Sequence, residues 1–176
     1  MTPQEEQRLK NLFVQNNPHA NRGIKAATGH IRTYADHVTS QQKIIIRQSW
    51  VDKIDELALK YVTPQSFETF IADISALETH MNESFPGMFA EGSFSFARAQ
   101  KSFSVVLKYR WCEGIISTPP MCPIDRGVLR HLGHPFNIWR WPEMTEEQYL
   151  QAYRRIGVLA NEKNMSVAQL ELLWFS

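Results

Sequence analysis

The 176-residue sequence has few cysteines and no long apolar run, and these absences exclude several classes of protein. Two cysteines, Cys112 and Cys122, cannot build a disulfide framework, and in a reducing compartment we expect them to stay thiols. No apolar stretch approaches the roughly 18–20 residues that a membrane helix needs. The N-terminus, MTPQEEQRLK, lacks the basic-then-apolar pattern of a signal peptide. We therefore expect a cytoplasmic protein with no membrane partner.

The sequence also lacks internal repeats, low-complexity stretches and the familiar cofactor motifs. It contains no Walker A loop, no G-x-G-x-x-G, no G-x-S-x-G and no H-E-x-x-H, so we expect no cofactor. Apolar residues make up 43% and charged residues 21%, a composition that is ordinary for a globular chain and excludes intrinsic disorder. The length predicts one domain over residues 1–176.

Signals for β-strands are missing as well. No segment alternates apolar and polar residues, and no Asn-Gly or Asp-Gly pair marks a hairpin. Helix starts are frequent instead: Thr2-Pro3, Thr145 with Gln148, and Ser166 with Gln169 are typical of helix caps. The sequence predicts an all-α fold, a single compact domain of about six to eight helices.

Three further elements can be placed from spacing. Thr63-Pro64 predicts a helix start before an apolar face formed by Phe67, Phe70, Ile71, Ile74 and Leu77. A long helix is expected over about 94–113, and a short one from about Asp125 to Gly133. Between them the proline-rich stretch 117–123 predicts a rigid loop. The apolar C-terminus, 170–175, predicts a tail docked into the core.

The net charge of +1 conceals a segregation along the chain. Residues 17–50 carry a net charge of +4, residues 51–93 carry −6, and residues 94–141 carry +5. The two basic blocks also hold most of the histidines and several aromatic residues, a mixture suited to phosphate contacts and base stacking. If the fold brings the two basic blocks together, we expect the molecule to have one basic face and an acidic face opposite to it.

The stretch from Ala99 to Gly133 contains the most informative chemistry. Lys101 lies near the start of the long predicted helix, and Asp125 follows Pro123 at the start of the short one. At 100° per residue, Lys101 shares a helix stripe with Lys108, so it could face a cleft while apolar neighbours anchor the helix. This arrangement resembles the helix-hairpin-helix DNA glycosylase superfamily, in particular an atypical branch such as the archaeal 8-oxoguanine glycosylases.

The resemblance implies a DNA glycosylase that removes a modified or damaged base, with abasic-site lyase activity as a possible second step. In that family a lysine and an aspartate in these positions form the catalytic pair, which here are Lys101 and Asp125. The lysine attacks the sugar of a flipped nucleotide, with Lys108 expected as a neighbouring cation that favours the neutral amine. The partner would be DNA, contacted by a set of basic side chains: Arg98, Lys108, Arg126, Arg130 and His131.

A second group of residues has the chemistry of a metal site. Cys112, Cys122, His131 and His134 are the ligand types of structural zinc, but their spacing, C-x9-C-x8-H-x2-H, is uncommon. We therefore expect no metal, and we assign Cys112 to the core and the histidines to the surface or to DNA.

Two alternative functions stay open at this point. R-x4-H elements, as in all-α ribonucleases of the HEPN type, occur at Arg32…His37 and Arg126…His131. Such an enzyme would cleave RNA by acid–base chemistry. The chain could also be a non-catalytic nucleic-acid-binding module whose basic segments grip the polymer without forming a product.

Overall fold

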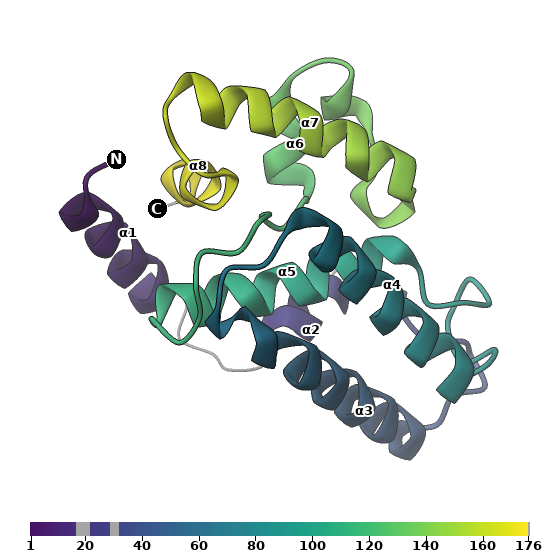
Figure 1. Ribbon diagram of the computed structural model, residues 1–176. Coiled ribbons are helices and arrows are strands. Elements are labelled where there is room, and N and C mark those ends of the chain that lie inside the picture. The colour runs from purple at the N-terminus through teal and green to yellow at the C-terminus, as the bar shows by residue number, and fades with distance from the viewer. Residues whose placement is uncertain (17–21, 29–31, 176) are drawn as a thin grey trace.

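The computed structural model describes residues 1–16, 22–28 and 32–175. Parts of the first basic block, residues 17–21 and 29–31, lie outside this description, as does residue 176. The all-α prediction is confirmed, because the described residues form eight α-helices and no strand (Figure 1). These helices are α1 (Pro3–Asn16), α2 (Arg22–Thr28), α3 (Ser40–Ala58), α4 (Phe67–Ser84), α5 (Phe96–Cys112), α6 (Arg126–Leu132), α7 (Glu146–Glu162) and α8 (Val167–Trp174).

The described residues also form three short 3₁₀-helices: η1 (Leu59–Val62), η2 (Phe136–Ile138) and η3 (Trp141–Glu143). Helix α5 crosses the middle of the molecule, with α3 and α4 on one side and α6, α7 and α8 on the other (Figure 1). Twelve of its 17 residues are buried, which makes α5 the central helix of the core. Among the described residues, no helix is both long and apolar enough to cross a membrane.

Most predicted helix caps are present as hydrogen bonds. Thr145 and Ser166 each form a complete capping box, and the Thr2 hydroxyl accepts from the backbone N–H of Glu5. The long helix begins at Phe96, two residues later than predicted, and it is capped by Ser95. The delay has a physical cause, since the peptide groups of Phe94 bind the side-chain amide of Asn82 and stay outside the helix.

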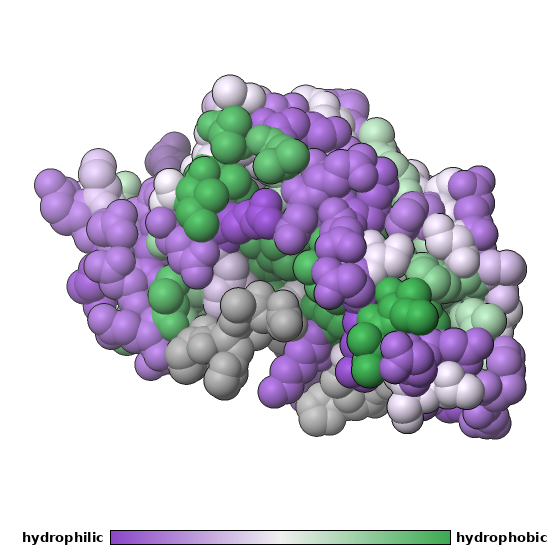
Figure 2. All heavy atoms as spheres, turned by 90° about the horizontal axis from the view of Figure 1, so that it is seen from below, coloured by the Kyte–Doolittle hydropathy of each residue, from purple (hydrophilic) through white to green (hydrophobic). Residues whose placement is uncertain are grey.

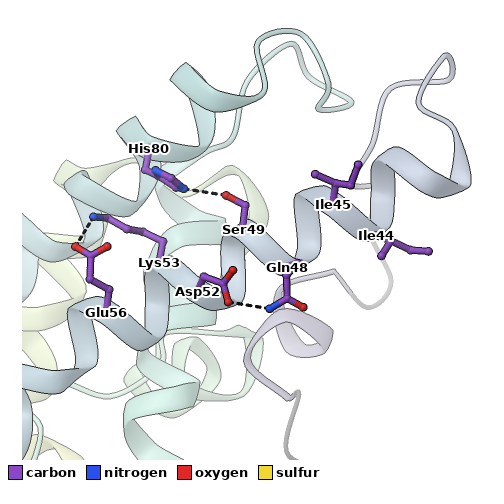
Figure 3. Close-up of a pocket in the computed structure, with 8 residues that line it drawn as sticks. All are labelled: Ile44, Ile45, Gln48, Ser49, Asp52, Lys53, Glu56 and His80. Atoms are coloured by element: carbon purple, nitrogen blue, oxygen red, sulfur yellow. Dashed lines mark hydrogen bonds and ion pairs between the residues drawn. The ribbon is translucent and has the colours of Figure 1, made fainter.

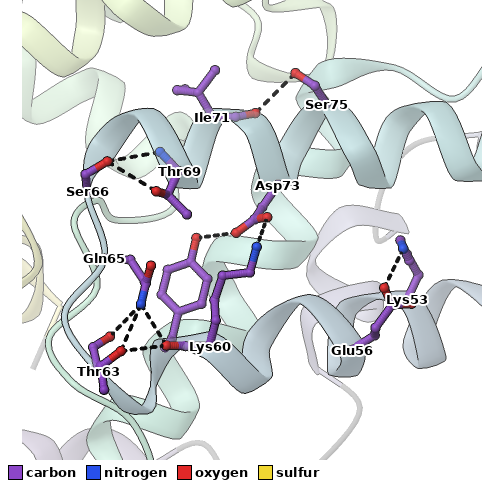
Figure 4. Close-up of polar contacts among 11 residues, drawn as sticks. Lys53, Glu56, Lys60, Thr63, Gln65, Ser66, Thr69, Ile71, Asp73 and Ser75 are labelled. Carbon is purple, nitrogen blue, oxygen red and sulfur yellow. Dashed lines mark hydrogen bonds and ion pairs between the residues drawn. The ribbon is translucent and has the colours of Figure 1, made fainter.

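The predicted start of α4 at Thr63-Pro64 is wrong. The cap is Ser66, whose hydroxyl accepts from the N–H of Thr69 at 3.1 Å. Thr63 instead donates its hydroxyl to the Lys60 carbonyl and closes η1 (Figure 4). The predicted apolar face is confirmed, because Phe70, Ile74 and Leu77 are fully buried and Phe67 and Ile71 pack against the core.

A buried carboxylate joins η1 to α4. Asp73 accepts hydrogen bonds from Lys60 Nζ at 2.6 Å and from the Tyr61 hydroxyl at 2.8 Å (Figure 4). Burial and the neighbouring Asp73 together raise the pKa of Tyr61, so this hydroxyl remains a hydrogen-bond donor. The contact holds the end of α3 against α4, and with it the pair of helices that supports α5.

The predicted docking of the C-terminal tail is confirmed for part of it, since Leu173 and Phe175 remain 39% and 40% exposed, and a buried ion pair accompanies the docked residues. Leu170 and Leu172 are completely buried. Beside them Glu171 receives the ammonium of Lys108, with distances from Nζ of 2.6 and 2.8 Å to the two carboxylate oxygens. The Lys108 ammonium also lies 4.1 Å from the centre of the Phe13 ring, so this pair connects α1, α5 and α8.

The face seen in Figure 2 is mostly hydrophilic, and hydrophobic side chains gather on it in separate patches. Exposed large hydrophobic residues flank α3: Ile44 and Ile45 lie near its start, and Leu59 and Val62 follow its end. Because a helix rises 1.5 Å per residue, about 20 Å of mostly polar helix separates the two groups.

Candidate active site

Lys101 lies in the second turn of α5, where the helix meets the loop before α6. The neighbouring residues Gln100 and Ser102 are buried, but the Lys101 side chain retains 12% exposure. Its ammonium lies 4.2 Å from the centre of the Trp141 ring, a cation–π contact that fixes the end of a flexible side chain. The lysine therefore reaches solvent from a largely enclosed position.

Asp125 is the N-cap of α6, as its position after Pro123 predicts. Its Oδ1 accepts from the backbone N–H groups of Gly127 at 2.8 Å and Val128 at 3.1 Å. These two hydrogen bonds orient the carboxylate and leave Oδ2 directed at Lys101, with 3.3 Å between Oδ2 and Nζ. The structure thus brings together two residues that are 24 positions apart in the sequence.

The backbone next to this pair is clamped by Gln100, which is completely buried. The Gln100 amide donates to the carbonyl of Ile124 at 2.8 Å and accepts from the N–H of Ile124 at 3.3 Å. The Gln100 side chain therefore satisfies both backbone hydrogen-bonding groups of Ile124, as a neighbouring β-strand would do. Since Gln100 precedes Lys101 and Ile124 precedes Asp125, the clamp sets the distance between the two candidate catalytic groups.

The end of α8 covers the outer side of α6. The ring of His131 stacks on Trp174, with 4.6 Å between ring centres and 4° between planes. Phe175 meets the same imidazole edge-on at 5.5 Å. Phe175 also lies so close to Gly127 that a Cβ there would come within 2.8 Å of the ring. Because Gly127, in the first turn of α6, has no side chain, the Phe175 ring can lie beside Asp125.

Two residues predicted to contact nucleic acid lie inside the protein, and that prediction is corrected for both. Arg98 is 2% exposed, and its guanidinium donates to the Arg32 carbonyl at 3.0 Å. Lys108 is 5% exposed and paired with Glu171. A side chain buried in this way does not reach a phosphate on the surface. Its pairing also removes Lys108 as the cation expected to act on Lys101.

The remaining predicted contacts are on the surface. Arg126, Arg130 and His131 are all exposed on α6, the helix that begins at Asp125. Among the described residues, no carboxylate lies within 4 Å of Arg126 or Arg130. The free positive charge of α6 therefore adjoins the Lys101–Asp125 pair.

The zinc ligand set does not assemble. Within the described ranges, no group of three or more His, Cys, Asp or Glu side chains is arranged to hold a metal. Cys112 and Cys122 are both buried, whereas His131 and His134 are exposed. Burial raises the pKa of Cys112 to about 12, so this thiol is a core residue.

The two R-x4-H elements have different surroundings. Arg32 forms an ion pair with Asp36, and His37 is exposed on the same irregular segment. Arg126 and His131 lie on α6, where the imidazole stacks on Trp174 and meets the Phe175 ring edge-on. The ribonuclease interpretation stays a prediction.

A separate open groove of about 540 Å³ lies between α3 and α4 (Figure 3). Ser49 and His80 point toward each other across it, with 3.0 Å between Oγ and Nε2. Its other polar residues pair along α3, Gln48 with Asp52 and Lys53 with Glu56. None of the lining residues belongs to the Lys101–Asp125 site.

Comparisons with protein-family models, curated proteins and solved structures return no match. The interpretation of the site accordingly rests on its own geometry. Three residues of that geometry were missed by sequence reasoning: Gln100, Trp141 and Phe175. Gln100 had a detectable signal, because it interrupts an apolar stripe of α5, whereas the contacts of Trp141 and Phe175 depend on chain packing over long distances.

Proposed function

We propose that the protein is a DNA glycosylase with Lys101 as nucleophile and Asp125 as its acidic partner. The observation that carries this proposal is the distance of 3.3 Å between Lys101 Nζ and Asp125 Oδ2. The two groups come from different elements, and each is oriented by further contacts, the lysine by Trp141 and the aspartate by two backbone N–H groups. Fixed positions of both groups are what a catalytic pair requires.

The chemistry follows from these positions. A target nucleotide flipped out of the duplex would place its anomeric carbon near Nζ, at an unstacking cost of a few kcal/mol. The Lys101 ammonium first gives a proton to water, which frees the amine lone pair and leaves the Asp125 carboxylate ionised. A bond then forms between Nζ and the anomeric carbon as the glycosidic bond breaks, and the base leaves with the electron pair and takes up a proton.

Asp125 has a second role in this step. Positive charge develops on the sugar as the glycosidic bond breaks, and a fixed carboxylate beside it lowers the barrier. The adduct nitrogen then gives a proton to the ring oxygen as the sugar ring opens, and the product is a Schiff base with a protonated nitrogen. Transfer of a proton from the adjacent sugar carbon to water leaves its electron pair to form a carbon–carbon double bond and expels the 3′ phosphate, and this elimination is the lyase reaction.

The Schiff base provides the test. Borohydride adds hydride to the imine carbon and fixes the protein covalently to DNA that contains an abasic site. Trapped product should form with the unaltered protein and should be lost in Lys101→Gln. Asp125→Asn preserves the α6 cap, because asparagine caps helices well, and it should reduce trapping by removing the charge.

The chain contains a matched control for this substitution. Lys10 also has 12% exposure, pairs with a carboxylate (Glu6, at 2.6 Å) and lies 4.2 Å from a tryptophan ring (Trp111). Lys10→Gln should therefore leave trapping intact. Equal trapping by Lys101→Gln and the unaltered protein would remove Lys101 from the mechanism. Salt-dependent DNA binding without any product would favour the non-catalytic module, and cleavage confined to RNA would favour the ribonuclease.

A further inference from the structure

A cluster of two cations and a tyrosine lies where α3 begins, outside the site described above. Arg47 donates from Nε to the Tyr34 hydroxyl at 3.2 Å. Arg47 Cζ and Lys43 Nζ each lie 5.7 Å from the centre of the Tyr34 ring. We call these three residues the Tyr34 cluster. One aromatic ring thus holds two positive charges in a defined place on the surface.

The ring itself is fixed by the fold. The backbone of Tyr34 forms an isolated antiparallel bridge with Phe89, and the two rings stack with 6.5 Å between centres. Hydrogen bonds on both sides of the bridge, Ala35 to Met88 and Ala90 to Thr33, extend this pairing. The Tyr34 cluster is therefore built on a rigid base, unlike cations on an exposed helix face.

The charges of the cluster are uncompensated. No carboxylate in the described part of the chain lies within 4 Å of Lys43 or Arg47. These residues are four positions apart on α3, and like charges at that spacing repel each other and destabilise a helix. The first turn of α3 also contains no acidic residue. A bound anion would remove this repulsion.

The cluster is attached to the same end of α5 as the candidate active site. The guanidinium of Arg98, one helical turn before Lys101, donates to the carbonyl of Arg32 in the segment that leads to Tyr34. The second basic block contains Lys101 and α6, so the fold does join the two basic blocks through α5. Since α3 and α6 lie on opposite sides of α5 (Figure 1), an anion that contacts both the Tyr34 cluster and α6 has to extend past α5, as a duplex does.

We propose that the Tyr34 cluster binds the phosphodiester backbone of duplex DNA that flanks the nucleotide in the Lys101 site. Arginine and lysine are the usual phosphate contacts, and tyrosine hydroxyls also donate to phosphate oxygens. A small anion on an open surface is screened by salt, whereas a polyanion gains affinity by releasing counterions at each contact. The choice of DNA as the partner of the Tyr34 cluster rests on the proposed function.

Salt dependence of DNA binding tests the cluster separately from catalysis. The full chain binds a labelled 25-base-pair duplex carrying a non-cleavable abasic analogue, and fluorescence anisotropy gives the dissociation constant at several salt concentrations. The double variant Lys43→Gln/Arg47→Gln should lower the slope of log affinity against log salt by about 2, since each phosphate contact contributes about 0.9. By the same relation, affinity near 0.1 M salt should fall on the order of 10- to 100-fold.

Two further variants separate geometry from charge. Arg154→Gln/Arg155→Gln removes two exposed cations from α7 and should leave the slope unchanged, which controls for net charge. Tyr34→Phe keeps both cluster charges but removes the hydroxyl that holds Arg47. It should weaken binding a few-fold while the salt slope stays close to that of the unaltered protein. Circular dichroism confirms that each variant is folded.

The outcomes distinguish this inference from the proposed function. A reduced slope without any borohydride trapping supports the cluster and contradicts the glycosylase. Trapping combined with an unchanged slope in Lys43→Gln/Arg47→Gln overturns the cluster and leaves the glycosylase standing. An equal loss of slope in the α7 control variant also overturns it. Tighter binding to single-stranded RNA or to anionic lipid vesicles than to the duplex overturns the assignment of DNA as partner.

Discussion

The buried pair of Lys108 and Glu171 should dominate the stability of the C-terminal half. Both side chains are only 7% exposed, and the ammonium lies within 2.8 Å of both carboxylate oxygens. Glu171→Gln keeps the shape of the side chain but removes its charge. It leaves a buried ammonium against the ring of Phe13, and no other carboxylate of the described residues lies within 4 Å of it.

Removing one member of such a pair costs about 3–5 kcal/mol, because the remaining charge stays desolvated. The free energy of unfolding of proteins of this size is typically about 5–15 kcal/mol, so the loss is a large fraction of the total stability. A change of 1 kcal/mol moves the melting temperature by about 2–4 °C for a chain of 150–250 residues. The melting temperature of Glu171→Gln should therefore fall by roughly 6–20 °C.

Urea unfolding followed by circular dichroism and by tryptophan fluorescence measures the change, and coincidence of the two transitions tests for two-state behaviour. The double variant Lys108→Met/Glu171→Leu should recover most of the loss, since apolar residues of similar size often replace a buried pair without cost. Glu143→Gln, which breaks an exposed pair with Arg140, should cost below about 1 kcal/mol.

A loss below about 1 kcal/mol in Glu171→Gln would contradict the reasoning, because an exposed pair behaves in that way. A double variant as unstable as the two single variants combined would contradict it as well. In that case the packing of the long side chains, and not the uncompensated charge, would carry the energy.

Three further predictions concern packing, thiol reactivity and pH. Gly23→Ala should destabilise the protein by about 1–3 kcal/mol in urea unfolding, because its Cβ would lie 2.4 Å from a side-chain carbon and 2.6 Å from a backbone oxygen of α5. A Cβ at Gly157 would meet open space, so Gly157→Ala should instead stabilise α7 by about 0.5–1 kcal/mol. If both substitutions changed the free energy of unfolding in the same direction, the close contact at Gly23 would be contradicted. Burial raises the pKa of Cys112 and of Cys122, so neither should react with a disulfide reagent at pH 8 until urea unfolds the chain. Burial also raises the pKa of Glu78, so its contribution to stability is present at low pH and is lost as the pH rises through the raised pKa. Unfolding at pH 4 and pH 7 should show Glu78→Gln gaining stability relative to the unaltered protein as the pH rises, and an equal difference at both values would refute this.

The sequence was sufficient for most features of the structure that depend on neighbouring residues. The capping boxes at Thr145 and Ser166 and the N-cap at Asp125 follow from contacts within three residues, and all are present. The all-α fold follows from the same local signals. The start of α4 was wrong because Thr63 and Ser66 are both acceptable caps, and the choice between them depends on the closing turn of η1.

Prediction failed where a charge is buried by distant parts of the chain. Arg98 and Lys108 belong to the second basic block and were predicted to contact DNA, which requires exposed side chains. Their burial requires the Arg32 carbonyl and the Glu171 carboxylate, which are 66 and 63 residues away in sequence. A count of charges by segment locates the basic blocks but does not say which cations face solvent.

At the candidate site, one unexpected residue in the sequence indicates a contact with a distant part of the chain. Phe96, Phe103, Leu107 and Trp111 form one buried stripe of α5, and Gln100 occupies the position in it where an apolar residue is expected. A buried amide costs free energy unless its donor and acceptor are both bonded, so a glutamine in this place requires a polar partner from another element. That partner is the peptide group of Ile124, one residue before Asp125. Gln100 thus occupies a core position and fixes the spacing of Lys101 and Asp125. An ordinary surface ion pair would not require a buried side chain for this purpose.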